Sequence, residues 1–341
     1  MEILAAMILL HTQEVAGSSP AAPTIKNQAL AGRSPTPRQS CCTTQVVGWS
    51  HMENILVTGA TGNVGRQVVS QLLATDARVR AMARSPESAG LPRQVEVVHG
   101  DLTVPATLDR CLDGVDAVFL MWQAPAAGVA PALERIAKHG RRIVFLSNLT
   151  VRDGIEEQAY PVTTLHARIE RLIEVSGVRW TFLRPGAFAA NARIWWAPQV
   201  RAGDVVRWPY PGAVTSPIHE HDIAAVAVRA LCEEGHAGAK YILTGPQSLT
   251  QRDQVRAIGD AISRPLRFEE IPPEAARREM ANIMPASIAD MLLDAWQNVE
   301  YAGSASVGKP ALVTSTVTDI TGVPARSFHD WAVDHAGDFQ Q

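Results

Sequence analysis

The sequence predicts an α/β fold built on a doubly wound parallel sheet. Between residues 54 and 186, short apolar runs alternate six times with segments of helical spacing, and the connections are short. The runs "VDAVFLMW" and "RRIVFLSN" are almost continuously apolar, as strands covered on both faces are. The first strand ends in a glycine-rich turn that leads into the first helix. Together these features place helices on both faces of one parallel sheet.

The elements follow from the hydrophobic period, taken in chain order. Strands are expected at 54–59, 78–84, 95–102, 115–122, 141–148 and 178–186, and helices at 63–76, 106–114, 131–140 and 169–177. Gly140 and Gly177 stand where helices are expected to end, because glycine suits a helix C-terminus. Further on, helices are expected at 221–235, 250–263 (opened by Thr250), 274–285, 288–298 and 327–336, and strands at 240–245 and 266–272.

Composition excludes several classes of function. The 341 residues are 46% hydrophobic and 19% charged, with a net charge of −3, so no nucleic-acid partner is indicated. The four cysteines form no CxxC, which argues against a zinc site and a disulfide framework and favours the cytoplasm. The apolar run near the start is too short for a membrane span, which takes about 20 residues. The expected partner is a small molecule, and oligomerisation stays open.

Residues 1–51 are rich in Ser, Pro, Gly and Ala and show neither a helical nor a strand period. Such a composition is typical of a disordered tail. The run "VAGSSP" resembles a translated tRNA gene, which suggests a second interpretation, a start codon placed too early with Met52 as the true start. Both interpretations stay open, and we assign this segment no function.

The turn "VTGATGNVGR" has the spacing of a dinucleotide-binding loop. It follows a predicted strand and opens a predicted helix, which is the context that this fingerprint requires. Gly59 permits the tight turn, Gly62 lets the backbone approach a pyrophosphate at the helix N-terminus, and Gly65 lets the helix lie close on the sheet. The alternative is a tight turn without a ligand. The expected cofactor contacts in this turn are Gly59, Thr61, Gly62, Asn63, Val64 and Gly65.

The end of the second strand indicates which dinucleotide is bound. NAD sites usually place Asp or Glu there, whereas this chain has Arg84 and Ser85. A guanidinium holds a 2′-phosphate bidentately, so NADP(H) is favoured over NAD(H), the alternative being a solvated surface arginine. Further cofactor contacts are expected after the later strands, at Asp101, Leu102, Trp122 and Pro185.

The amino-acid composition of the sequence changes after Gly186. Residues 187–212 are rich in aromatic residues, Pro and Gly, which is typical of a segment that lines a pocket. We therefore predict an NAD(P)-binding core over 52–186 and a small C-terminal α/β substrate-binding part over 187–341. The segment 217–245, with one more helix and strand, is expected to return to the core.

The segments "VTGATGNVGR", "FLSN", "SGVRWTFLRPGAFAAN", "SPIHEHDIAAVA", "YILTGPQSLT" and "DITGVPARSFHDWA" together resemble the NmrA-like branch of atypical short-chain dehydrogenase/reductases. The resemblance covers about residues 52–336. It implies an extended Rossmann fold, a small C-terminal substrate-binding part and a nicotinamide dinucleotide in the cleft. The family includes NADPH-dependent reductases of quinones, dyes and other conjugated compounds, and also redox sensors that bind the cofactor and catalyse nothing.

The usual Tyr-x-x-x-Lys pair of the wider superfamily is absent. Against the family's helix, Val162 stands at the tyrosine position and His166 at the lysine position, while Tyr160 lies two residues from the expected place. His166 either contacts the nicotinamide ribose and donates a proton, or it is a partly buried residue paired with Glu170 one turn on. Ser147 ends the fifth strand, where the family often has a serine facing the substrate. The catalytic candidates are therefore His166, Tyr160 and Ser147.

The motif "SPIHEHDIA" raises the question of a metal site. His219 and His221 stand two residues apart with Asp222 beside them, but no other cluster of ligands supports a metal, and we predict none. Asp222 is expected to be the N-cap of the following helix.

The missing pair bears on the substrate. Hydride delivered to a simple ketone leaves a strongly basic alkoxide, whereas a quinone or an extended conjugated system leaves a delocalised anion that water or a histidine can protonate. We therefore expect an NADP(H)-dependent oxidoreductase acting on a quinone-like or conjugated aromatic small molecule. A non-catalytic NADP(H)-binding sensor and a non-redox isomerase or cyclase on the same fold stay open as alternatives.

The aromatic side chains of residues 187–212 are consistent with a flat acceptor, because apolar rings pack well against an aromatic ligand. Packing in the core or at a subunit contact explains each of them equally well. The expected substrate contacts are Phe188, Asn191, Trp195, Trp196 and Trp208.

Overall fold

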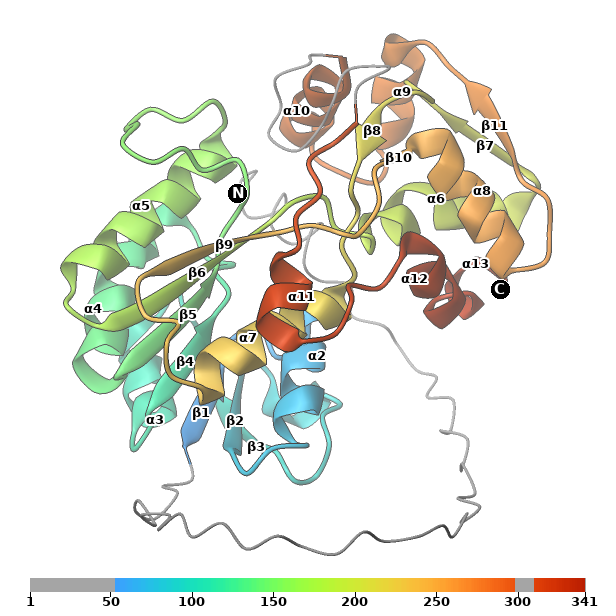
Figure 1. The fold of residues 1–341 in the computed structure, drawn as a ribbon. Coiled ribbons are helices and arrows are strands. Elements are labelled where there is room, and N and C mark those ends of the chain that lie inside the picture. Colours follow the sequence, from blue (N-terminus) through green and yellow to red (C-terminus); the bar gives the residue numbers. More distant parts are fainter. Residues whose placement is uncertain (1–52, 298–309, 341) are drawn as a thin grey trace, which may run out of the picture.

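The computed structural model describes residues 53–297 and 310–340 (Figure 1). Its centre is a seven-stranded sheet in the order β3-β2-β1-β4-β5-β6-β9, with every neighbouring pair parallel. The strands are β1 (Asn54–Val57), β2 (Arg78–Ala83), β3 (Glu96–His99), β4 (Ala117–Leu120), β5 (Arg142–Leu146), β6 (Arg179–Pro185) and β9 (Ala239–Leu243). The predicted doubly wound parallel sheet is confirmed. The two interpretations of residues 1–51 lie outside the described residues.

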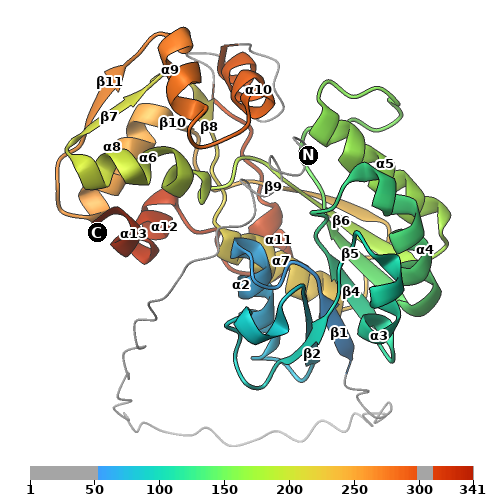
Figure 2. The same ribbon diagram turned by 180° about the vertical axis from the view of Figure 1, so that it is seen from behind.

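Helices cover both faces of this sheet (Figures 1 and 2). One face carries α2 (Asn63–Leu72), α7 (Glu220–Cys232) and α11 (Thr316–Thr321), and the other carries α3 (Leu108–Leu112), α4 (Val129–His139) and α5 (Pro161–Val175). Three 3-10 turns lie in the connections, at η1 (Pro86–Ser88), η2 (Pro105–Thr107) and η3 (Ala126–Gly128). No helix in the described part of the chain is long and apolar enough to cross a membrane.

The remaining elements form a smaller α/β part that lies over the carboxyl edge of the large sheet (Figure 1). It holds an antiparallel pair, β8 (Val214–Thr215) with β10 (Leu249–Thr250), and a parallel pair, β7 (Val205–Trp208) with β11 (Arg267–Glu270). Its helices are α6 (Asn191–Ala202), α8 (Gln251–Ala261), α9 (Pro273–Met280), α10 (Ala286–Gln297), α12 (Phe328–Asp334) and α13 (Gly337–Gln340).

Two helix starts show how local sequence shapes this smaller part. Thr250 caps α8 through a capping box with Asp253, as the sequence predicts. Helix α6 occupies a segment for which we expected no helix. Pro198 lies inside α6. Proline has no backbone N–H to donate and is therefore rare inside helices, so its presence argued against a helix in this segment.

Candidate functional site

The predicted cofactor residues gather at the carboxyl edge of the large sheet. Because all seven strands are parallel, the loops that follow them share this edge. The strand order runs outward in opposite directions from β1 and β4. Ligands of doubly wound sheets bind in the crevice at such a point, so the loops after β1 and β4 are the expected cofactor-binding loops.

The turn after β1 has a shape that accepts only glycine at two positions. Gly59 has a φ of +61°, and a Cβ there would lie 2.0 Å from the Met121 Cε atom. A Cβ on Gly65 would lie 2.0 Å from the carbonyl oxygen of Gly59, so the start of α2 touches the turn. Thr58 ties the turn to the end of β4, since its hydroxyl accepts the Met121 N–H at 2.7 Å.

The first turn of α2 can bind an anion. Gly62 is its N-cap, and no side chain caps the helix, so the first N–H groups, at the predicted contacts Asn63 and Val64, have no side-chain acceptor in the described structure. Arg66 braces the turn, because its Nε donates to the Thr61 carbonyl at 2.8 Å while its other nitrogens bind carbonyls of the loop after β2. A pyrophosphate fits this braced, uncapped helix start.

The ends of β2 and β3 differ in what they offer a ligand. Arg84 and Ser85 follow β2 directly and are exposed, and Arg84 makes no hydrogen bond or ion pair with any residue that the structure describes. After β3, the Asp101 carboxylate accepts the backbone and side-chain hydrogens of Thr103, both at 2.8 Å. Leu102 is 7% exposed and packs in the core. As far as the described residues go, Arg84 therefore has its donors available for a ligand, whereas Asp101 is already engaged.

The end of β4 brings a residue that sequence reasoning missed. Trp122 is fully buried in the core, where its Nε1 donates to the Ala124 carbonyl at 2.6 Å. The next residue, Gln123, has a buried Nε2 without a hydrogen-bond partner in the described structure. Such a donor is costly unless a ligand accepts its hydrogen.

Ser147, at the end of β5, is buried, and its hydroxyl donates to the Glu170 Oε1 atom of α5. Glu170 also accepts from Arg184 of β6, from Nε at 3.0 Å and from Nη2 at 2.5 Å. A hydroxyl has a single proton to donate. Ser147 therefore offers only an acceptor to any other group.

His166 is 3% exposed, and its ring stacks on Phe145 with centroids 5.8 Å apart. Its Nδ1 lies 2.8 Å from the Val162 carbonyl, which only accepts, so Nδ1 carries the hydrogen. Burial lowers the pKa of His166, which makes the ring neutral and leaves Nε2 without a proton. The alternative pairing of His166 with Glu170 is not formed, because Glu170 is bonded to Ser147 and Arg184.

Tyr160 is the N-cap residue of α5 and is half-buried against the core. Burial, and then the negative charge of Asp294 on α10, raise the pKa of the Tyr160 phenol. The phenol is therefore protonated at neutral pH. Ser147 and His166, by contrast, hold their hydrogens in bonds to Glu170 and to the Val162 carbonyl.

The predicted substrate contacts form a tryptophan wall in the smaller part. Trp195 stacks on Trp208 with centroids 6.2 Å apart and meets Trp296 edge-on at 5.4 Å. Trp196 and Trp208 are almost fully buried, while Trp195 is partly exposed. Trp196 and Trp208 pack in the core, but the buried Nε1 of each has no hydrogen-bond partner in the described structure, and Trp195 is the ring with free surface.

The loop after β6 joins the two parts of the chain. Pro185 ends β6 in register with Leu243 of β9. Phe188 and Asn191 are 9% and 5% exposed, and Phe188 forms a β-bridge with Ile218. These contacts fix the position from which α6 starts.

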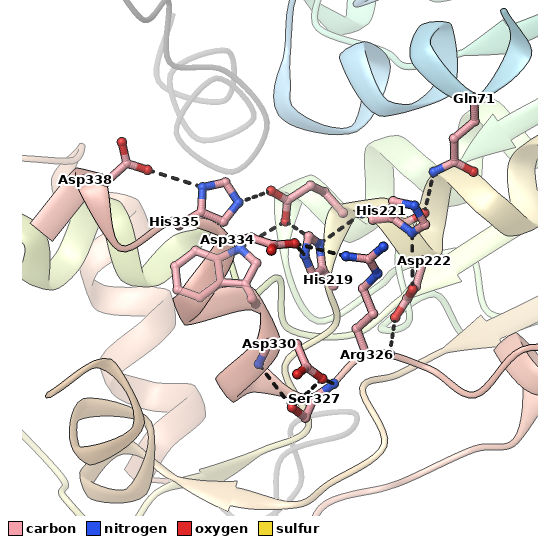
Figure 3. A network of polar contacts seen from close by, with 12 residues as sticks. Gln71, His219, His221, Asp222, Arg326, Ser327, Asp330, Asp334, His335 and Asp338 are labelled. Carbon is pink, nitrogen blue, oxygen red and sulfur yellow. Dashed lines mark hydrogen bonds and ion pairs between the residues drawn. The ribbon is translucent and has the colours of Figure 1, made fainter. Parts of the chain in front are cut away.

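The histidines of "SPIHEHDIA" belong to a polar network at the start of α7 (Figure 3). His219 is the N-cap, because its Nδ1 accepts the His221 N–H at 3.1 Å. The prediction that Asp222 caps α7 is therefore wrong; its carboxylate accepts the Arg326 N–H at 2.7 Å instead. Within residues 53–297 and 310–340, no group of three or more His, Cys, Asp or Glu is placed to hold a metal ion.

The same network joins α7 to the C-terminal helices. Glu220 is 2% exposed and accepts from Trp331 Nε1 at 3.1 Å and from His335 Nε2 at 2.7 Å. The other ring nitrogen of His335 lies 3.2 Å from Asp338 (Figure 3). Burial works against the charged ring, but the two carboxylates outweigh it and raise the pKa of His335 to about 9.

Comparison with known proteins decides the family. The model of a family described as NAD(P)H-binding matches residues 59–234, more than half of the chain. The chain belongs to this family. A (4-alkanoyl-5-oxo-2,5-dihydrofuran-3-yl)methyl phosphate reductase from Streptomyces griseus is 40% identical over 291 residues, 84% of this chain and 99% of that protein. An NAD(P)H azoreductase from Xenophilus azovorans is 33% identical, with 84% of this chain and 99% of that protein covered.

Solved structures show the same fold. The triphenylmethane reductase of Citrobacter with NADP(H) superposes with a TM-score of 0.68 at 21% identity, covering 83% of this chain and 99% of that chain. The NADPH-dependent quinone oxidoreductase of Escherichia coli with NADPH gives 0.68 at 22% identity, covering 82% and 99%. The Rossmann fold and the resemblance to NmrA-like oxidoreductases are thus confirmed, and the cofactor is NAD(P)H.

Proposed function

We propose that this chain is an NADPH-dependent reductase of quinone-like and other conjugated acceptors. The observation that carries the proposal is where the protons lie on the three catalytic candidates. Ser147 gives its hydrogen to Glu170, and His166 holds its ring hydrogen on the Val162 carbonyl. The Tyr160 phenol is protonated at neutral pH, but Thr164 stands four residues on, where a lysine would lower the phenol pKa. A site with one weak donor suits acceptors that need no strong acid.

When bound, NADPH supplies the hydride. A simple ketone would then need a proton at once, because an alkoxide is too basic to persist. A quinone, an azo group or an unsaturated diketone-like system spreads the charge over several atoms, so the Tyr160 phenol or water protonates it without lysine assistance. The tryptophan wall around Trp195 supplies an apolar surface against which a flat acceptor packs.

The similar proteins support this class of acceptor. Their names state a quinone, an azo compound and an alkanoyl-substituted unsaturated lactone as the compounds reduced. In that lactone, the ring double bond is conjugated with two carbonyl groups. The three compounds share an electron-poor conjugated system. Such a system stabilises the anion formed by hydride transfer, which is the property that we expect of an acceptor when no strong acid is at hand.

The preference for NADPH rests on Arg84. It is exposed at the end of β2 and unpaired within the described residues, so its guanidinium is free for a 2′-phosphate. Replacing it (Arg84→Ala) should raise the KM for NADPH about tenfold or more, because a hydrogen bond to a charged group contributes about 1.5–3 kcal/mol. The KM for NADH should change less than about twofold, since NADH has no 2′-phosphate. Equal effects on both cofactors would assign Arg84 to the solvated surface.

The proposal is tested by following NADPH oxidation with 1,4-naphthoquinone, an azo dye and an acyl butenolide. Turnover on at least one of them supports it. Cofactor binding without turnover on any of them contradicts it and favours the sensor. Conversion of an acceptor that does not require NADPH favours the isomerase or cyclase.

We also propose a cytoplasmic location. Cys111 and Cys232 are both free thiols, as expected in a reducing compartment. Cell fractionation that recovers the protein outside the cytoplasm would contradict this.

A further inference from the structure

The β5–α5 loop, residues 147–160, ends at Tyr160 and is bonded within itself. The Gln158 side chain accepts the Arg152 N–H at 3.0 Å and donates to the Arg152 carbonyl at 3.0 Å and to the Ile155 carbonyl at 2.6 Å. These bonds make residues 152–158 one unit. Any shift of this unit reaches Tyr160, which follows two residues later.

Asp153 attaches this unit to the sheet. Its carboxylate accepts from Arg184 of β6 at 2.7 and 3.2 Å and from Lys240 of β9 at 2.7 Å. These hydrogen bonds, first from Arg184 and then from Lys240, lower the pKa of Asp153 to about 2. Asp153 is therefore ionised at neutral pH and held by two cations.

The support behind Asp153 is buried and stays intact without it. The side chains of Arg184 and Glu170 are 7% and 4% exposed and form a two-bond pair with each other. The Asp153 side chain itself is 59% exposed. Removal of Asp153 leaves Arg184 paired with Glu170, so no buried charge is stranded and the fold should persist.

We propose that Asp153 is a positioning residue that holds the β5–α5 loop, and with it the Tyr160 phenol, in place against the acceptor. The inference rests on the proposed reductase function and deepens it. It assigns to Asp153, a carboxylate proposed to touch neither cofactor nor acceptor, the role of keeping the proton donor in position. Bidentate contact with Arg184 restricts both distance and orientation, which a single surface ion pair does not do.

The same loop offers a matched control. Glu156 forms an ion pair with Arg171 of α5 at 3.0 Å, with side chains 85% and 58% exposed. Exposed pairs of this kind contribute little. Glu156→Ala and Asp153→Ala thus remove the same charge from the same loop, but only the second removes the bonds of residues 152–158 to the sheet.

The test compares Asp153→Ala and Glu156→Ala, each with and without Tyr160→Phe, using 1,4-naphthoquinone and saturating NADPH. Asp153→Ala should lower kcat about tenfold with the KM for NADPH unchanged within about twofold, and Glu156→Ala should change kcat less than about twofold. With Phe at position 160, Asp153→Ala should lower kcat by less than a further factor of about two, because residues that act as a unit are not additive. Equal losses in both backgrounds, or an equal loss from Glu156→Ala, would overturn the proposal.

Amide hydrogen exchange gives a readout that needs no activity. Asp153→Ala should speed exchange across residues 152–160 about tenfold while residues 163–175 of α5 stay protected, and Glu156→Ala should not. Unchanged exchange in Asp153→Ala would overturn the proposal whatever the kinetics. Wild-type protein without turnover on any acceptor would instead overturn the reductase function, and the exchange result would still show whether Asp153 holds the loop.

Discussion

Two regions of the molecule bury a glutamate that belongs to a helix, and they neutralise its charge in different ways. The α5 cluster comprises Ser147, Asp153, Glu170, Arg184 and Lys240, and the α7 cluster comprises His219, Glu220, Trp331, His335 and Asp338. Glu170 and Glu220 are 3% and 2% exposed. The first glutamate has an arginine as its cation, and the second has a histidine.

The choice of cation decides how each region responds to pH. A guanidinium stays charged throughout the working range, and its contacts raise the pKa of Arg184 further, against the opposing effect of burial. An imidazolium loses its charge as pH rises, which leaves the Glu220 carboxylate with fewer partners. The permanent cation therefore holds the α5 cluster together over the whole working range of pH, and the titratable one joins α7 to the C-terminal helices.

The largest effect is expected from Arg184→Met in the α5 cluster. The substitution leaves Glu170 as a buried carboxylate without a cation, which costs about 3–5 kcal/mol. Urea unfolding at pH 7 measures the loss. Arg171→Met, which removes an exposed arginine of α5, the helix that carries Glu170, serves as the control and should cost less than about 0.5 kcal/mol.

The next effect is the loss of stability at alkaline pH. The pKa of His335 is about 9, against 6.5 for the free side chain. A raised pKa means that the folded state binds the proton more tightly, so the contribution is complete below pH 6.5 and is lost as pH rises through 9. The difference of 2.5 units corresponds to at most about 3 kcal/mol in the free energy of unfolding. Urea midpoints between pH 6 and pH 10 would show it, and a flat profile would contradict the assignment.

His335→Gln should cost somewhat less at pH 7, about 2 kcal/mol, because the amide still donates a hydrogen bond to Glu220. The variant should also lose the alkaline dependence of the wild-type protein. A cost above that of Arg184→Met would reverse the order of the two clusters.

The smallest effect is expected on the acid side. The pKa of Asp153 is lowered from 3.8 to about 2, so its contribution is present above pH 3.8 and is lost as pH falls through 2. Because the Asp153 side chain is 59% exposed, solvent screening limits the contribution to less than about 1 kcal/mol. The difference in stability between wild-type and Asp153→Ala at pH 7 and at pH 2.5 measures it.

Features set by neighbours in sequence were predictable. The parallel strands follow from continuous apolar runs, and the glycine turn follows from residues that lie within seven positions of each other. The side-chain partners were not predictable, because they come from distant segments. The Ser147 hydroxyl meets Glu170 23 residues on, and Glu220 meets His335 115 residues on.

One wrong prediction has a local cause. Asp222 is a usual capping residue, but His219 is the N-cap of α7 because its ring nitrogen accepts the His221 N–H. At the end of β4, the sequence does not show which side chain has a buried donor without a partner among the described residues; that side chain is Gln123, whereas Trp122 donates to the Ala124 carbonyl.

We expect that the acceptor must stabilise its own anion, since Thr164 stands four residues after Tyr160 where a lysine would make the phenol a stronger donor. The most direct test compares two acceptors of the same ring size, 1,4-naphthoquinone and 1-tetralone, by NADPH oxidation under identical conditions. We expect the kcat/KM for 1,4-naphthoquinone to be at least about a thousandfold higher than that for 1-tetralone, which corresponds to a difference of about 4 kcal/mol in activation free energy. Comparable rates on the simple ketone would contradict it.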